Sequence, residues 1–200
     1  MKSIVLASGN PGKKAEIEQL LAPFGTRVVT QVELGITEAE EPHETFLENA
    51  LAKARHVSFA TRLPALADDS GLCVDALGGA PGVHSAYYAG REGSRAERDA
   101  RNNEKLLSEM KEQDHRSAHY VCVMVLVRGP GDTQPLIAEA EWHGEIARAP
   151  RGSGGFGYDP YFCLPELGKT AAELAPEEKN RLSHRGQALA KLLELLKREP

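Results

Sequence analysis

The chain has 200 residues, of which 41% are hydrophobic, and it carries a formal net charge of −5 at pH 7. This length fits one domain, or one domain with two lobes, and the apolar content is enough for a sizeable core. The negative net charge argues against nucleic acid or an anionic membrane surface as the main partner.

Two further features indicate a cytoplasmic protein. The three cysteines are widely spaced and lie beside apolar residues, which is typical of reduced thiols and not of a disulfide framework or a zinc site. The apolar run at residues 4–7 is too short for the core of a signal peptide, and no run approaches the length that spans a bilayer.

The first apolar run predicts a buried strand, and the Gly-rich turn after it leads into a helix with apolar residues at i, i+3, i+4 and i+7 from Ile17. A strand, a glycine turn and a helix N-terminus can hold phosphate through backbone N–H groups, with Lys13 adding a full charge. The P-loop spacing is absent, and many such turns bind no ligand.

The segment 33–44 is acidic, and for most of its residues a solvated loop is the simplest interpretation. Thr45 and Glu48 form a capping-box pattern that predicts the start of the next helix. Asn49 and Lys53 lie close to the apolar stripe of that helix. A lysine there either binds an anion or extends its ammonium group to solvent.

Two adjacent carboxylates, Asp68 and Asp69, stand between the apolar runs 65–67 and 72–74. We interpret the pair as the end of a buried strand. Two carboxylates at that position suit Mg²⁺, which prefers oxygen ligands. The alternative is a polar turn, because Asp, Ser and Gly all favour turns.

Beyond the pair, Gly and Pro at 78–82 predict a loop, and Ser94 with Glu97 predicts another helix start. Residues 119–127 are apolar on both alternating faces, which predicts a central strand. Alternation over 136–143 predicts a half-exposed strand, and 170–174 predicts a short capped helix.

The stretch 151–160 combines closely spaced glycines with the aromatic residues Phe156 and Tyr158. It can form a stacking platform for a base, or a tight hairpin with aromatic residues in the core. A last helix is expected from about residue 177, with cationic residues in its early turns that are either a solvated face or donors toward a base.

Together these stretches resemble the Ham1/RdgB family of noncanonical purine nucleoside triphosphate pyrophosphatases. The matching motifs follow the family's order over nearly the whole chain; they lie at 6–13, 46–54, 67–72, 77–82, 155–160, 169–174 and 183–186. Tyr87 is a departure, because an arginine is expected after Ser85 and Ala86; Ser8 replaces a common threonine and keeps the hydroxyl.

The resemblance implies an α/β fold with a central mixed β-sheet flanked by helices, and a single domain over residues 1–200 with two lobes and a nucleotide-binding cleft between them. It also implies a homodimer and Mg²⁺-dependent hydrolysis of ITP, dITP and XTP to the monophosphate and pyrophosphate.

Carried onto this chain, the resemblance assigns catalysis to Asp69 and Asp68, and metal binding to Asp69 with Glu41 or Glu40. The residues that would hold the triphosphate are Ser8, Gly9, Asn10, Pro11, Gly12, Lys13 and Lys53. Those that would surround the base and sugar are Ser70, Phe156, Gly157, Tyr158, Asp159, Lys179, His184 and Arg185.

The chemistry of the base supports this assignment. Hypoxanthine and xanthine carry a keto oxygen where adenine carries an amino group, and Lys179 and Arg185 can only donate. Two alternatives are a Maf-like pyrophosphatase of modified pyrimidine nucleotides and a nucleotide-binding module without turnover.

Overall fold

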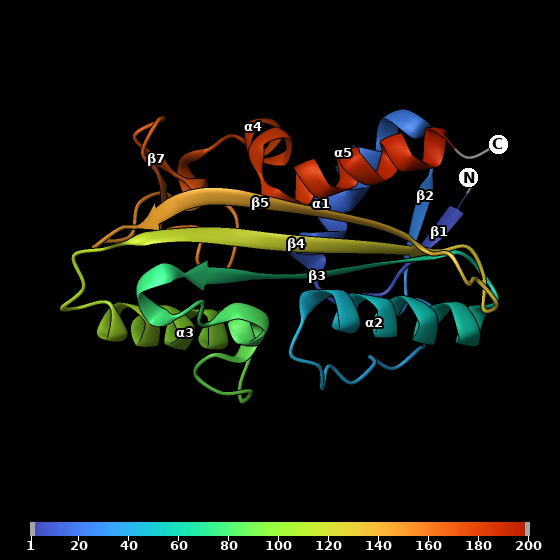
Figure 1. The fold of residues 1–200 in the computed structure, drawn as a ribbon, viewed down its shortest axis with the longest axis horizontal. Coiled ribbons are helices and arrows are strands. Elements are labelled where there is room, and N and C mark those ends of the chain that lie inside the picture. The colour runs from blue at the N-terminus through green and yellow to red at the C-terminus, as the bar shows by residue number, and fades with distance from the viewer. Residues whose placement is uncertain (1–2, 199–200) are drawn as a thin grey trace. The chain divides into compact units, whose positions relative to one another are not determined.

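The structure is a computed structural model that describes residues 3–198. Its strands form a seven-stranded sheet in the order β2-β1-β3-β4-β5-β6-β7 (Figure 1). The strands are β1 (Ser3–Leu6), β2 (Arg27–Thr30), β3 (Ala65–Val74), β4 (Ser117–Val127), β5 (Leu136–Ile146), β6 (Phe162–Leu164) and β7 (Lys169–Thr170). β1 pairs in parallel with β2 and β3, whereas β6 pairs antiparallel with β5 and β7. The predicted mixed sheet is therefore confirmed.

Two compact units divide the chain, and the strands β3, β4 and β5 contribute residues to both. The first unit comprises Met1–Asp69, Cys122–Ala140 and His184–Pro200. The second comprises Ser70–Val121 and Glu141–Ser183.

The first unit contains α1 (Pro11–Leu21), α2 (Phe46–Thr61) and α5 (His184–Lys197). Within this unit α2 covers one face of the strands, while α1 and α5 lie on the other (Figure 1). Its apolar core joins Ile17 and Leu21 of α1 and Leu189 and Leu192 of α5 to the strands. Thr45 caps α2 by accepting from the backbone N–H of Glu48, as the sequence predicts.

The second unit contains α3 (Arg95–Glu109) and α4 (Pro176–Leu182). The predicted capping box of Ser94 and Glu97 is present at the start of α3. Short 3-10 helices span Asp75–Leu77, Gly82–Tyr87 and Ala171–Glu173. The core of this unit includes the closely packed rings of Tyr120, Trp142 and Phe162.

Two predictions about local structure were wrong. β3 does not end at the acidic pair but continues through it to Val74, because each carboxylate has a cationic partner and no turn is needed to expose it. The predicted last helix is two helices, since Ser183 has an extended backbone conformation between α4 and α5. The residues predicted to form its first turns belong to α4, and the rest belong to α5.

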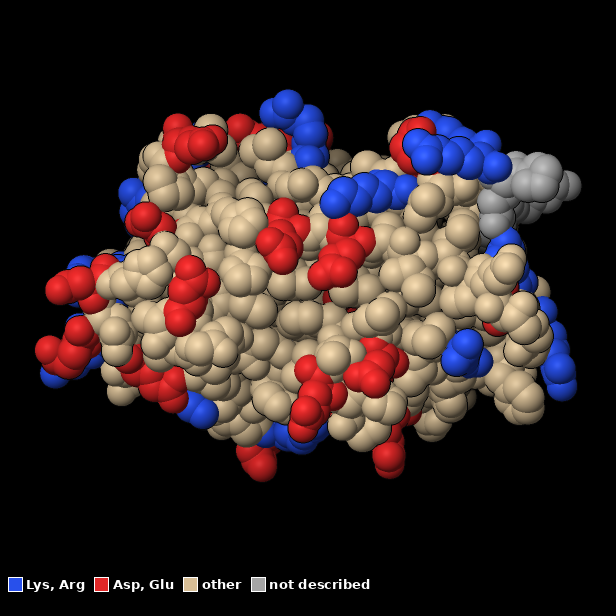
Figure 2. Space-filling model, in the orientation of Figure 1, with Lys and Arg blue, Asp and Glu red and all other residues tan. Residues whose placement is uncertain are grey.

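Surface features are consistent with the composition. On the face shown in Figure 2, acidic and basic side chains are interspersed among uncharged ones. Within residues 3–198, no helix has both the length and the apolar character needed to cross a membrane.

Candidate active site

The acidic pair lies in the middle of β3, where successive side chains point to opposite faces of the strand. Asp68 is fully buried and Asp69 is 7% exposed. Because they point to opposite faces, the two carboxylates have different partners and can have different roles. Both partner sets lie within the first unit.

Asp68 is the centre of a buried charge cluster. Its Oδ2 accepts from Nε of Arg185 at 3.0 Å and from the thiol of Cys122 at 3.0 Å, and its Oδ1 pairs with the ammonium of Lys13. The guanidinium of Arg185 also pairs with Glu16. Burial alone would raise the pKa of the Asp68 carboxyl, but Arg185 and Lys13 outweigh burial and hold that pKa well below its ordinary value.

Asp69 faces a second, smaller cluster. The ammonium of Lys53, on α2, lies 2.6 Å from Oδ1 of Asp69 and 2.6 Å from Oε1 of Glu41. The predicted position of Lys53 near the inner face of its helix is confirmed, and its partners are two carboxylates. Oδ2 of Asp69 is buried and has no hydrogen-bond partner among residues 3–198.

The pKa of Asp69 is shifted in the opposite direction from that of Asp68. Burial raises the pKa of the Asp69 carboxyl, although Lys53 opposes that effect. Burial would lower the pKa of the Lys53 ammonium, yet Asp69 and Glu41 raise it above its ordinary value. Lys53 therefore favours its charged form and holds one oxygen of Asp69, while the other, buried oxygen has no partner within residues 3–198.

The residues near Asp69 suit a hard divalent cation. Oδ2 of Asp69 is a buried carboxylate oxygen without a hydrogen-bond partner within residues 3–198, and Glu41, whose side chain is 31% exposed, supplies a second oxygen ligand. Within the described part of the chain, no three His, Cys, Asp or Glu side chains are grouped to form a complete metal cage. This arrangement fits Mg²⁺, which keeps several waters and takes further ligands from substrate phosphates. Glu40 is exposed.

The turn before α1 is held by its own side chains. Oδ1 of Asn10 accepts from the backbone N–H of Gly12 at 2.9 Å and of Lys13 at 3.3 Å. Oγ of Ser8 accepts from the N–H of Asn10 at 3.1 Å, and Glu38 accepts from Gly9. The N–H groups predicted to face phosphate thus have internal acceptors. Their role in binding phosphate stays a prediction, as does that of Pro11, the first residue of α1.

A second cluster lies within the second unit, around the Gly-aromatic stretch. Oδ2 of Asp159 accepts from Nζ of Lys179 and from the backbone N–H of Phe156, each at 2.8 Å. Nζ of Lys179 and Cζ of Arg95 are each 4.9 Å from the centre of the Phe156 ring. These distances are in the range of cation–π contacts.

Glycine is required at position 155 of this cluster. Its φ is +70°, and a Cβ atom there would lie 2.0 Å from Oδ2 of Asp159. Any other residue would displace the carboxylate that holds Lys179. Tyr158 is buried, and its hydroxyl donates to the backbone oxygen of Ser85 at 2.8 Å. The signal for this arrangement was visible in the sequence as the spacing of glycines.

The predicted base-binding residues are divided between the clusters. Phe156, Gly157, Tyr158, Asp159 and Lys179 come together in the second unit. Arg185 belongs to the Asp68 cluster, and its neighbour His184 is buried at the start of α5. Ser70 is partly exposed and follows Asp69 on β3. The contacts of Glu16 and Cys122 were not predicted, because neither residue stands in a recognisable motif.

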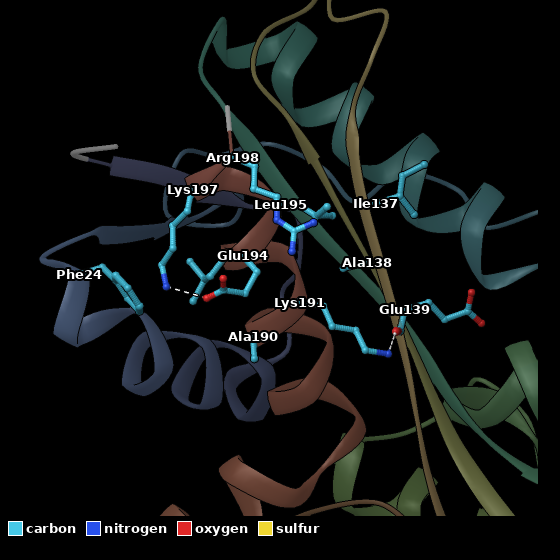
Figure 3. A pocket seen from close by; sticks show the side chains of 11 residues that line it. Phe24, Ile137, Ala138, Glu139, Ala190, Lys191, Glu194, Leu195, Lys197 and Arg198 are labelled. Atoms are coloured by element: carbon cyan, nitrogen blue, oxygen red, sulfur yellow. Dashed lines mark hydrogen bonds and ion pairs between the residues drawn. The ribbon is translucent and has the colours of Figure 1, made fainter. Parts of the chain in front are cut away.

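A hollow elsewhere in the first unit contains none of the predicted site residues. It has a volume of about 650 Å³ and lies between α5 and the start of β5 (Figure 3). Its lining is largely apolar, with Phe24 at one end (Figure 3). The ammonium of Lys191 donates to the backbone oxygen of Glu139, and that of Lys197 donates to the carboxylate of Glu194 (Figure 3). The chemistry of the acidic pair is therefore not located there.

Comparison with known proteins identifies the family. The family model described as the Ham1 family matches residues 4–195. The chain belongs to the Ham1 family. The resemblance found in the sequence is thereby confirmed, and the match spans both clusters. No part of the site described above lies outside the matched range.

Relatives of this Ham1-family chain are similar over nearly its full length. A dITP/XTP pyrophosphatase of Nitrosomonas europaea is 63% identical over 196 residues, covering 98% of this chain and 95% of that protein. A dITP/XTP pyrophosphatase of Ralstonia nicotianae is 63% identical over 197 residues, covering 98% of each. The structure of a HAM1 protein from Coxiella burnetii matches with a TM-score of 0.89 and 47% identity, and the match covers 100% of both chains.

Proposed function

We propose that this chain is a nucleoside triphosphate pyrophosphatase that hydrolyses dITP, XTP and ITP to the monophosphate and pyrophosphate. The observation that carries the proposal is the buried carboxylate of Asp69, held by Lys53 through one oxygen while the other has no partner within residues 3–198. The names of relatives that are 63% identical support the choice of substrate. A Maf-like activity on pyrimidine nucleotides and a module without turnover have no comparable support.

Asp69 is the group that acts on water in this proposal. Its Oδ2, which has no partner within residues 3–198, accepts a proton from the attacking water or orients that water toward the α-phosphorus. Lys53 fixes the carboxylate in place. Glu41 and Asp69 would hold Mg²⁺, with Glu40 as the alternative to Glu41, and the ion supplies neutralisation of the charge that develops on the phosphate oxygens.

The turn before α1 and Lys13 would receive the triphosphate. Asn10 Oδ1 now accepts the two N–H groups, from Gly12 and Lys13, that a phosphate oxygen would accept. Rotation of this one side chain frees both donors without moving the backbone. Ser8 and Lys53 supply a hydroxyl and a charge to the same end of the substrate.

The Phe156 cluster would recognise the purine. Lys179 can only donate, so its ammonium can bond a keto oxygen at position 6 but would face the amino group of adenine without a bond. The Phe156 ring offers a flat face, and a base that stacks on it would take the place of one of the two cations now beside it. The base-reading roles of Arg185, His184 and Ser70 stay predictions.

We further propose that the two units act together as one nucleotide pyrophosphatase domain with the cleft between them. The homodimer, the cytoplasmic location and the lack of a nucleic-acid partner stay predictions. The interspersed charges in Figure 2 and the net charge of −5 are consistent with the last of these.

One assay tests the function. Purified protein is incubated with ITP, XTP, dUTP or ATP, with Mg²⁺ or with EDTA, and the nucleotide and phosphate products are separated. We expect inosine or xanthosine monophosphate with one pyrophosphate, in the presence of Mg²⁺ only. Release of orthophosphate with a nucleoside diphosphate, or faster turnover of dUTP or ATP, would contradict the proposal.

A further inference from the structure

One face of α3 lies against the Gly-aromatic stretch, and three polar residues mark that face. Arg95, Asp99 and Asn103 are spaced four residues apart, which places them in a row along the helix. Arg95 lies beside the Phe156 ring and within 3.6 Å of Asp99. None of the three was predicted as a site residue.

The second and third residues of this row, Asp99 and Asn103, both bind the backbone of Gly157. Oδ2 of Asp99 accepts from the N–H of Gly157 at 3.2 Å. Nδ2 of Asn103 donates to the carbonyl oxygen of the same glycine at 3.0 Å. Both backbone polar groups of Gly157 are therefore bound by α3.

Gly157 is a point at which the loop could otherwise move. Its φ is +63°, and nothing lies within 4 Å of the position that a Cβ atom would occupy. The space on that side of the residue is therefore open. The residue before it carries the ring that contacts Lys179, and its N–H is held by Asp159, so the two hydrogen bonds to α3 hold the next residue of the loop on the other side of the ring.

Folding stability alone does not explain why position 103 is an asparagine. Its Oδ1 is buried and has no hydrogen-bond partner within residues 3–198. With asparagine the Oδ1 lacks a partner, and with an apolar residue of similar size the carbonyl oxygen of Gly157 would lose its partner, so the two costs largely offset each other and the exchange should change stability little. The bond to Gly157 is what an apolar residue cannot supply.

We infer that Asp99 and Asn103 are positioning residues that determine base selectivity by fixing Gly157, and with it the Phe156 ring and the approach of a purine to Lys179. The inference rests on the proposed function, because it needs this cluster to face the base. Neither residue touches the reacting phosphates, so they act on recognition of the base and leave the chemical step intact.

Asn103→Leu is the first test, because it removes the donor and the buried acceptor together and keeps the size. We expect kcat/KM for ITP to fall by about three- to tenfold, the factor that one neutral hydrogen bond contributes. The loss should lie mainly in KM, with kcat/KM for ATP unchanged within error and the melting temperature retained. Glu104→Leu, at an exposed position on the same helix, is the matched control and should keep the ITP-to-ATP ratio of the parent chain.

Asp99 provides a second, independent test. Asp99→Asn keeps an oxygen that can accept from Gly157 and should keep most of the selectivity, whereas Asp99→Leu should lose it. Hydrogen exchange in residues 155–159, which does not depend on activity, should be faster in Asp99→Leu and Asn103→Leu than in the parent chain.

The possible results distinguish failure of the positioning role from failure of the proposed pyrophosphatase activity. If the parent chain hydrolyses ITP but both leucine variants keep its ITP-to-ATP ratio and its exchange rates, the positioning role is refuted. Equal losses on ITP and ATP together with a lower melting temperature also refute it, since they indicate a structural role only. If the parent chain itself releases no pyrophosphate from ITP, the proposed function fails, and the inference fails with it.

Discussion

Asp68→Asn tests the buried charge cluster of the first unit. The cluster contains two cations, Arg185 and Lys13, and two anions, Asp68 and Glu16, so it is electrically balanced. Asp68 is 0% exposed and Arg185 is 2% exposed. The substitution therefore leaves an unbalanced positive charge beside the buried guanidinium of Arg185.

Breaking a buried ion pair by removing one partner costs about 3–5 kcal/mol. For a chain of this size each kcal/mol shifts the melting temperature by about 2–4 °C, so we expect a fall of about 6–20 °C. Adding Lys13→Met to Asp68→Asn restores the balance, so the double variant should be more stable than the sum of the two single losses predicts.

The contribution of Asp68 to folding stability should be lost at low pH. Because the pKa of Asp68 is lower in the folded chain than in the unfolded chain, its stabilising contribution is fully present above the ordinary carboxyl pKa of about 3.9. The contribution decreases as the pH falls below that value toward the pKa of the folded state. The stability difference between the parent chain and Asp68→Asn should therefore be constant from neutral pH to about pH 5 and shrink below pH 4.

Urea unfolding measures the difference, with Asp69→Asn as the matched control. That variant makes the same change at the next residue, where Lys53 keeps Glu41 as a partner, so its loss of stability should be smaller. Equal unfolding midpoints for the parent chain and Asp68→Asn would refute the stabilising role of the cluster.

Three further predictions concern the site. Glu41→Gln should raise the Mg²⁺ concentration for half-maximal activity by about tenfold or more, while Glu40→Gln should not; equal shifts would contradict the choice between them. Lys179→Met should lower kcat/KM for ITP by about tenfold or more and leave that for ATP nearly unchanged, and a common loss on both would remove Lys179 from base recognition. Lys13→Ala should raise KM for ITP by about tenfold or more, so an unaltered KM and kcat would exclude a phosphate contact.

Much of the fold followed from local patterns in the sequence. The apolar run at 119–127 is long enough to identify β4, and the alternation after residue 136 identifies β5, because a strand repeats every two residues. Lys53 was found from its place on the stripe of α2. Each of these features depends on residues close together in the chain.

The rest depends on contacts between distant residues. β3 passes through Asp68 and Asp69 because Arg185, which is 117 positions from Asp68 in the sequence, supplies a guanidinium to bury with the carboxylate. No periodicity in the sequence pairs those two residues. For the same reason the pairing of Arg185 with Asp68 was not predicted, and neither were the contacts of Cys122 and Glu16 in that cluster.

The sequence also did not show that Asp68 and Asp69 point to opposite faces of β3. A pair of adjacent carboxylates at a strand end would act together, whereas within a strand they point apart and serve separate partners. The continuation of the strand to Val74 places Asp68 and Asp69 on opposite faces, and Oδ2 of Asp69 is buried without a hydrogen-bond partner within residues 3–198. The catalytic role assigned to Asp68 stays a prediction.

The most direct test of the account is single-turnover release of pyrophosphate from ITP by the parent chain and by Asp69→Asn, with Mg²⁺ present and ITP binding measured in parallel. We predict that Asp69→Asn folds, binds ITP and loses turnover by about 100-fold or more, the contribution of a general base. Turnover equal to that of the parent chain would show that the open carboxylate on β3 is not where the reaction takes place.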